Sequence, residues 1–113
     1  MFNLDINDLI GFFGTLPIEA IEHDGFWKFR VEDTVGMFLE VSIDIFQASI
    51  DVKIYYDSNL ITLLNLENCE SVKYKNIQGQ QKMFIKFTLQ ESLSELEIAI
   101  SPNIKVSYYR ITR

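Results

Sequence analysis

The 113-residue sequence has one cysteine, one histidine, two prolines and five glycines, and these scarcities limit what the chain can be. Cys69 has no second cysteine to pair with, so the fold needs no oxidising compartment. With 48% hydrophobic and 13% aromatic residues, the chain can bury enough apolar surface to offset its conformational entropy. No apolar run approaches the ~18 residues of a membrane helix. The first residues lack the basic flank of a secretory signal. We expect a single domain over residues 1–113 in the cytoplasm.

Side chains that carry chemistry are equally scarce. Gly11 and Gly14 lack the following Lys-Ser/Thr of a phosphate-binding loop. His23 and Cys69 lie in separate segments, whereas zinc needs three or four converging ligands, so we predict neither metal nor cofactor. The Glu22-His23-Asp24 run is the one constellation with a catalytic interpretation, because a carboxylate can tune a neighbouring histidine. A recognition role for His23 is favoured, and we predict that the chain is not an enzyme.

Basic residues are nearly absent from the first part of the chain. Residues 1–72 hold thirteen acids against three bases, a net charge of −10, whereas residues 73–113 carry +4. An acidic surface repels phosphate backbones, so nucleic acid is not an expected partner of this half. It attracts a basic protein and accelerates the encounter. A solvated surface that serves only solubility is the simpler alternative.

Hydrophobic periodicity predicts one helix followed by strands. Asn3–Gly14 has apolar residues at helical spacing, an acid-rich start and a glycine positioned to end it. The next segment, Ile18–Gly25, looks too short and acidic for a core element. From there the period changes to two, and Leu60–Leu66 alone fits either strand or helix. The expected strands lie near residues 26–31, 37–45, 49–56, 60–66, 71–75, 83–89, 95–100 and 104–109.

Short turns between these segments leave no room for the long connections of parallel strands. The predicted fold class is therefore α+β and β-dominated: an N-terminal helix followed by an antiparallel meander of 7–8 strands. A curved sheet, a sandwich and an open barrel all remain open. The pattern does not give the strand order.

Acidic and aromatic residues alternate with the predicted core positions and suggest a binding surface. Where two rings are adjacent, as in Phe26-Trp27, one must point away from the core, and an outward ring among carboxylates is typical of an interface hot spot. A covering helix or second sheet layer explains most of these rings equally well. The residues expected to contact a partner are Glu19, Glu22, His23, Asp24, Trp27, Glu40, Asp44 and Asp51.

One stretch also resembles a known group of proteins. Leu9-Ile10-Gly11-Phe12-Phe13-Gly14-Thr15-Leu16-Pro17, followed by Glu22-His23-Asp24-Gly25, is similar to small bacterial immunity proteins of polymorphic-toxin and contact-dependent inhibition systems. In one such group a helix ends in Phe-Gly, a proline follows a bulky residue, and His-Asp leads into a β meander. The resemblance implies tight binding of a cognate toxin in the cytoplasm, and many such toxins are nucleases with basic surfaces.

Two other functions remain open beside toxin neutralisation. A small-molecule or lipid-binding domain would place Met37, Phe84 and Phe87 around a cavity between sheet and helix. A self-associating accessory subunit would join copies through an apolar face or a strand edge, so both monomer and homodimer are compatible with the sequence.

Overall fold

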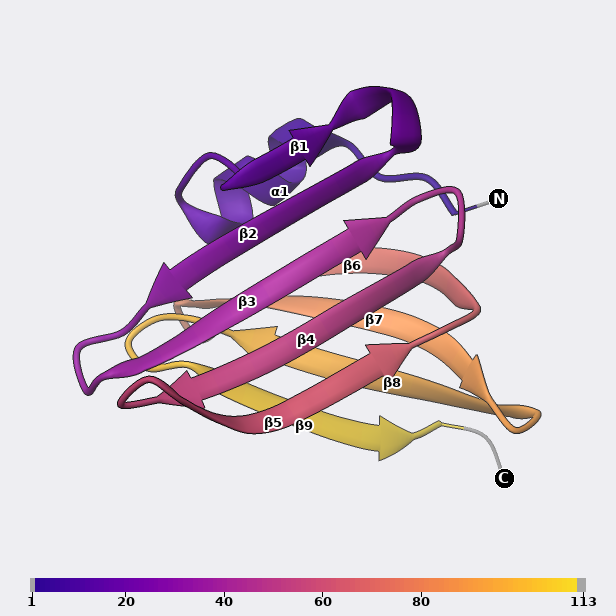
Figure 1. The fold of residues 1–113 in the computed structure, drawn as a ribbon. Helices are drawn as coiled ribbons and strands as arrows, with labels where there is room; N and C mark the ends of the chain where they lie inside the picture. The colour runs from indigo at the N-terminus through magenta and orange to yellow at the C-terminus, as the bar shows by residue number, and fades with distance from the viewer. Residues whose placement is uncertain (1, 112–113) are drawn as a thin grey trace.

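A computed structural model describes residues 2–111 and contains one helix, one 3-10 turn and nine strands within that range. Figure 1 shows their order along the chain. The elements are α1 (Ile6–Phe13), β1 (Glu19–Ile21), η1 (Glu22–Asp24), β2 (Phe26–Glu32), β3 (Met37–Asp44), β4 (Ser49–Tyr56), β5 (Asn59–Leu66), β6 (Cys69–Ile77), β7 (Gln80–Leu89), β8 (Ser92–Ala99) and β9 (Lys105–Arg110).

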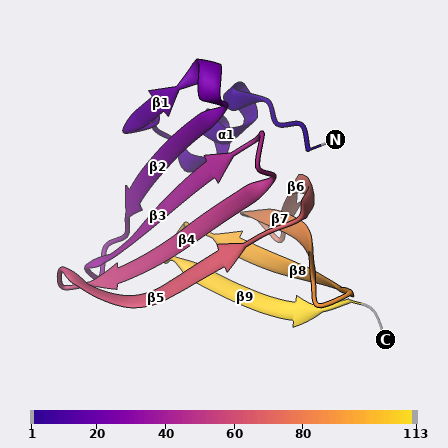
Figure 2. The same ribbon diagram turned by 45° about the vertical axis from the view of Figure 1, so that its right-hand side comes forward.

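The strands form two antiparallel sheets in which every strand pairs with its neighbours in sequence. Sheet A has the order β1-β2-β3-β4-β5 and sheet B the order β6-β7-β8-β9. The strands of sheet B run across those of sheet A at an angle, and α1 lies behind β1 and β2 (Figures 1 and 2). The β-dominated α+β prediction is confirmed, and the structure selects two stacked sheets from the arrangements that the sequence left open.

The helix begins and ends where its capping residues place it. The Asp5 carboxylate accepts a hydrogen bond from the Asn7 amide at 2.8 Å, and Gly14 adopts a left-handed φ of 72°. The predicted helix is therefore confirmed, although its first helical residue is Ile6. Phe13 stacks on Phe29 of β2 with ring centroids 4.6 Å apart. This contact docks α1 onto the inner face of sheet A. With eight residues, α1 is too short to span a membrane, and no other described helix is longer.

One core lies between the sheets and beneath the helix. Leu39 and Val41 of β3 and Val52 of β4 are fully buried because they occupy alternate, inward-facing positions. From sheet B, Ile85 and Leu96 are equally inaccessible and belong to the same cluster. Burying such a side chain contributes about 1.5–3 kcal/mol relative to exposure, so this layer holds the two sheets together.

The structure has more strands than the sequence predicted. Glu19–Ile21, interpreted as too short for a core element, forms the edge strand β1 against β2. Residues 60–66 are strand, within β5. The succession of paired strands divides after β5 into two sheets, which is one of the arrangements that the sequence left open, and Asn68, between β5 and β6, has a left-handed φ of 57°.

A single carboxylate ties the two sheets together at one end. Asp33, in the β2–β3 turn, accepts hydrogen bonds from the amides of Val35 and Met37 at 3.0 and 3.1 Å and from the amide of Ile104 at 3.0 Å. Although desolvation raises the pKa of Asp33, the three backbone hydrogen bonds bring it below its ordinary value. The charged carboxylate is therefore the form that the fold favours.

Candidate functional site

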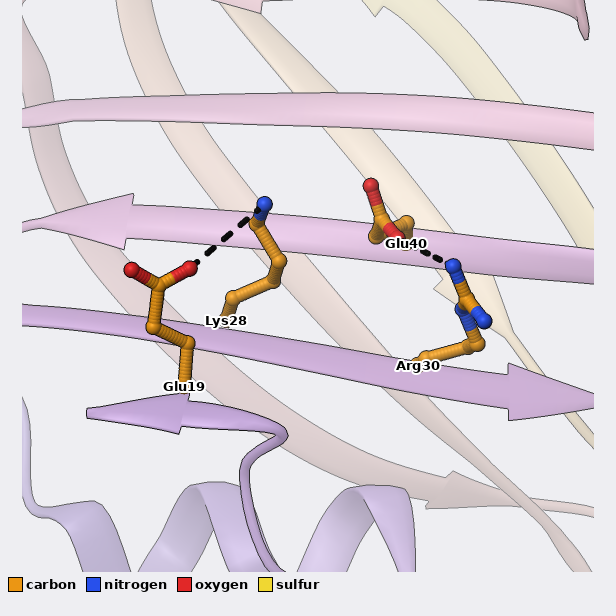
Figure 3. Close-up of polar contacts among 4 residues, drawn as sticks. All are labelled: Glu19, Lys28, Arg30 and Glu40. Atoms are coloured by element: carbon orange, nitrogen blue, oxygen red, sulfur yellow. Dashed lines mark hydrogen bonds and ion pairs between the residues drawn. The ribbon is translucent and has the colours of Figure 1, made fainter.

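The outer face of sheet A carries the polar residues that alternate with the core positions. The register places Glu19 opposite Lys28, and Arg30 opposite Glu40, on adjacent strands. Figure 3 shows these four side chains on one face of β1, β2 and β3. The face is therefore a mixed-charge surface rather than a uniformly acidic one.

The two ion pairs in Figure 3 differ in their surroundings. The Glu19 and Lys28 side chains are partly exposed, and their charged atoms lie 3.7 Å apart. Glu40 is only 7% exposed, and one of its carboxylate oxygens accepts a 3.0 Å hydrogen bond from the Arg30 guanidinium. Its other cross-strand neighbour is Lys53. The Glu40 carboxylate therefore makes its contacts within the sheet.

A shallow hollow of about 430 Å³ opens beside the ion pair of Glu19. We call it the Phe46 hollow, because the Phe46 side chain stands in it and is 72% exposed. Three carboxylates and several apolar groups surround the ring. The lining residues are Glu19, Ile21, Asp24, Phe26, Asp44, Phe46 and Gln47.

Local backbone geometry explains why an apolar ring is exposed at this point. Gly25 ends η1 with a φ of 63°, and its carbonyl accepts a hydrogen bond from the Ile45 amide at 2.9 Å. A β-carbon on Gly25 would lie 3.5 Å from the Phe46 ring, so the ring rests against the glycine backbone. The Asp44 carboxylate accepts a 3.0 Å hydrogen bond from the Gln47 amide and holds the turn that carries Phe46.

The structure gathers five of the eight predicted site residues around this hollow. Glu19, Asp24 and Asp44 line it, and Glu22 and His23 belong to the same 3-10 turn as Asp24. These residues come from β1, η1 and β3, which are brought together by the pairing of β1 and β3 on either side of β2.

The other three predicted residues lie elsewhere. Glu40 is buried in its ion pair, and Asp51 of β4 accepts a hydrogen bond from the side-chain amide of Asn65 on the same outer face. Trp27 points to the inner face and packs partly buried against the core, opposite Ile43. In the adjacent pair of rings, the one that faces outward is therefore Phe26, which lines the hollow.

Sequence reasoning missed Phe46 as a site residue. Phe46 directly follows the expected strand 37–45 and falls in the short turn before the strand expected at 49–56, where alternation assigns it to neither face. A large aromatic residue in a turn directly after an acidic strand end was the available signal.

The single histidine and the single cysteine have opposite environments. His23 lies 3.7 Å from the Asp24 carboxylate, and their side chains are 84% and 63% exposed. Cys69 is buried at the start of β6, and this desolvation raises the pKa of its thiol to about 12, so the thiol stays protonated at neutral pH. Within residues 2–111, no three His, Cys, Asp or Glu side chains are arranged to hold a metal ion.

The residues expected around a ligand cavity lie apart. Phe87 belongs to the core, whereas Phe84 of the same strand faces the opposite side of sheet B, with the Lys75 ammonium 5.2 Å from its ring centroid. Met37 lies at the start of β3 in the other sheet. The hypothesis that Met37, Phe84 and Phe87 share one cavity between sheet and helix is therefore wrong.

The Phe46 hollow combines features that bind a cationic, partly apolar side chain. An exposed aromatic ring offers both apolar area and a π face for a guanidinium. The carboxylates of Glu19, Asp24 and Asp44, which line the hollow, supply charge complementarity and hydrogen-bond acceptors for the same group. The arrangement fits a surface arginine or lysine of a protein better than a small diffusible ligand, because the hollow is open.

Comparison with known proteins gives one close structural match. The chain is similar to a protein in the "Contact-dependent growth inhibition toxin - immunity protein complex from Klebsiella pneumoniae 342", with a TM-score of 0.86 and 17% sequence identity. The match covers 96% of this chain and 95% of the other, so the two share a fold over nearly their whole length. No family model matches the sequence, and no curated protein matches it.

Proposed function

We propose that this chain is an immunity protein that binds a cognate bacterial toxin in the cytoplasm and neutralises it. The observation that carries the proposal is the end-to-end structural match to a chain of a toxin–immunity protein complex. The resemblance of the helix end and of the His23-Asp24 segment to immunity proteins points the same way from the sequence.

Two features favour the immunity side of such a pair over the toxin side. The Cys69 thiol is buried and protonated, which removes the chain's one candidate thiolate nucleophile. The His23 side chain is largely exposed, so it lacks the enclosed, water-excluding surroundings in which catalytic histidines work. Binding by occlusion needs neither residue as a catalyst.

The proposed interface centres on the Phe46 hollow. Glu19, Asp24 and Asp44 attract a basic toxin surface, such as the substrate-binding face of a nuclease domain, and Phe46 is the apolar anchor that is buried on contact. An acidic inhibitor at such a face takes the place of the phosphate backbone. Neutralisation then follows from steric and electrostatic exclusion of the substrate.

The remaining predicted residues have different roles in this proposal. Glu22 and His23 form the rim next to Asp24 and are free to contact the toxin. Glu40 holds Arg30 in place, so its contribution is to the shape of the outer face. Trp27 packs against the core on the inner face of β2.

The experiment is co-expression with the C-terminal domain encoded immediately upstream, followed by a growth assay and co-purification. We expect growth to be rescued and a stoichiometric complex to form. The Phe46→Ala variant should weaken binding by about 30-fold or more, the loss typical of a central hot spot. The Asp44→Lys variant should slow association, and more strongly at low salt than at high salt.

Asp57→Lys is the matched control. Asp57 is an exposed acid in the β4–β5 turn, at the opposite end of β4 from the hollow, and the same charge change there should leave the association rate nearly unaltered. A complex whose affinity is the same for wild type, Phe46→Ala and Asp44→Lys would place the interface elsewhere. A toxic neighbour that this chain neither binds nor neutralises would refute the proposal itself.

A further inference from the structure

The two sheets present four strand edges, and three of them are protected. An edge exposes unpaired amide and carbonyl groups that can pair with another chain, so proteins shorten such strands or place lysines on them. The edge strand β1 has three residues. The edge strand β6 carries the exposed Lys73 and Lys75, and β9 carries Lys105 and Arg110.

The fourth edge, β5, is neither short nor charged. All eight of its residues, Asn59–Leu66, are uncharged, and none is proline. Leu60, Ile61 and Leu63 are 50%, 58% and 56% exposed. The register shift opposite Ile54 and Tyr55 is a bulge near the start of the strand, and the pairing with β4 is regular beyond it. Figures 1 and 2 show β5 as the outermost strand of its sheet.

A groove lies on the inner side of the last residues of the same strand, and polar residues such as Glu67, Thr88 and Gln90 line it together with apolar ones. Its volume is about 460 Å³, and it lies between the end of β5 and the strands of sheet B. Leu64 and Leu66 form one wall, and Phe87, Leu96 and Tyr108 form the other. This edge therefore carries large apolar side chains on both of its faces, with Leu63 outside and Leu64 and Leu66 inside, and water solvates such side chains poorly.

We infer that β5 pairs with β5 of a second copy of this chain. Two antiparallel strands related by a two-fold axis present the same surface to each other, so the edge is complementary to itself. The charge of the chain supports a second copy as the partner of β5. The net charge is −6, so two copies repel each other over most approaches, whereas β5 itself brings no charged residue to the contact between the acids Asp57 and Glu67 that bound it.

The pairing extends sheet A of each protomer into one continuous sheet across the two-fold axis. It also leaves the Phe46 hollow open, because the hollow is built from β1, η1, β2, the end of β3 and the β3–β4 turn, none of which pairs with β5. The dimer therefore does not depend on the proposed function, and it predicts two unobstructed hollows per assembly.

The test is sedimentation velocity of the isolated full chain over a wide concentration range. We expect a concentration-dependent transition from monomer to dimer. Added salt should not dissociate the dimer, because the paired strands carry no charge. Monomer alone at the highest concentration would overturn the inference, and so would a dimer that dissociates in salt, since that would indicate contact between charged faces.

Leu63→Glu is the discriminating variant. Leu63 lies opposite Lys53 on β4, so a glutamate there gains a cross-strand ion pair within the protomer and the fold is kept. Across the two-fold axis the same glutamates repel, and the variant should stay monomeric. Leu16→Glu, the same change at an exposed leucine of the loop between α1 and β1, should dimerise like the wild type.

Hydrogen exchange gives a second measurement that needs no variant. Amides on the free edge of β5 exchange rapidly in a monomer and are protected once they bond to the second copy. Protection of residues 59–66 should rise with protein concentration, while the edges of β6 and β9 stay unchanged. A dimer that persists in Leu63→Glu, or one that forms without new protection in β5, would place the contact elsewhere.

Discussion

Replacing Asp33 by asparagine tests how the two sheets are joined. The Asp33 carboxylate accepts three backbone hydrogen bonds, two within the β2–β3 turn and one from Ile104, which precedes β9. Asparagine is nearly isosteric but has only one acceptor oxygen. If that oxygen keeps the bonds from Val35 and Met37, the amide group of the new side chain faces the amide of Ile104, donor against donor.

We expect Asp33→Asn to lower the free energy of unfolding by about 2 kcal/mol. A hydrogen bond to a charged acceptor contributes roughly 1.5–3 kcal/mol, and the lower part of this range applies because Asp33 is partly exposed. Ile104 is buried, so its amide cannot recover a full bond from water. For a chain of this size the loss corresponds to a fall of roughly 8 °C in the unfolding midpoint.

The effect should depend on pH in a defined direction. Because the folded-state pKa of Asp33 is lowered, its charged form stabilises the fold above the unfolded-state pKa of about 3.9, and this contribution is lost as pH falls through the folded value. Urea unfolding at neutral pH measures the loss of stability, and the same experiment at a series of acidic pH values measures how that loss depends on pH. The difference in free energy of unfolding between wild type and Asp33→Asn should have its full size at neutral pH. It should become smaller below about pH 4.

Asp57→Asn, the same substitution in an exposed turn, is the control and should change stability by less than about 0.5 kcal/mol. An Asp33→Asn variant as stable as the wild type at neutral pH would refute the argument. A difference in unfolding free energy that stays constant from neutral to acidic pH would show that the charge of Asp33 does not cause the loss of stability.

Two further predictions concern single residues of the fold. The buried Cys69, with its thiol pKa of about 12, should not react with a thiol reagent in the native protein near pH 8 but should react fully in denaturant; rapid native labelling would contradict its burial. Gly25→Ala should lower stability by about 1–2 kcal/mol in urea unfolding, because alanine is strained at a φ of 63°. Gly11→Ala, at an exposed helical position with open space around it, should raise stability by about 0.5–1 kcal/mol, and the same sign for both variants would disprove the conformational argument.

Much of the fold was readable because long strands alternate without interruption. Met37–Ile45 shows one buried and one polar face, and the structure has β3 there. β1 was missed because three residues are too few for a period to register, and it is a strand only through its pairing with β2. The division into two sheets falls between β5 and β6, at Asn68 with its left-handed φ, and no hydrophobic pattern reveals this position.

The candidate site was predictable only in part, because it depends on contacts between elements that the sequence of any one element does not reveal. Alternation requires Phe26 and Trp27 to face opposite ways but does not say which faces the core; the stacking of α1 on β2 decides this. Glu40 belongs to the polar phase of β3, yet cross-strand neighbours cover it from both sides. Asp24 and Asp44 are distant in sequence and meet only through the β2–β3 register.

The order of strands also bears on how the chain acquires its structure during synthesis. Every strand of both sheets is hydrogen-bonded to a strand adjacent in sequence, so each sheet grows by successive hairpins that close only short loops. Sheet A can be complete while sheet B is still inside the ribosome. Its inner face, with Leu39, Val41 and Val52, then stays exposed until the residues of sheet B emerge. Docking of sheet B, rather than formation of any hairpin, is the step that encloses the core, and a truncated or stalled chain would present this apolar sheet to chaperones.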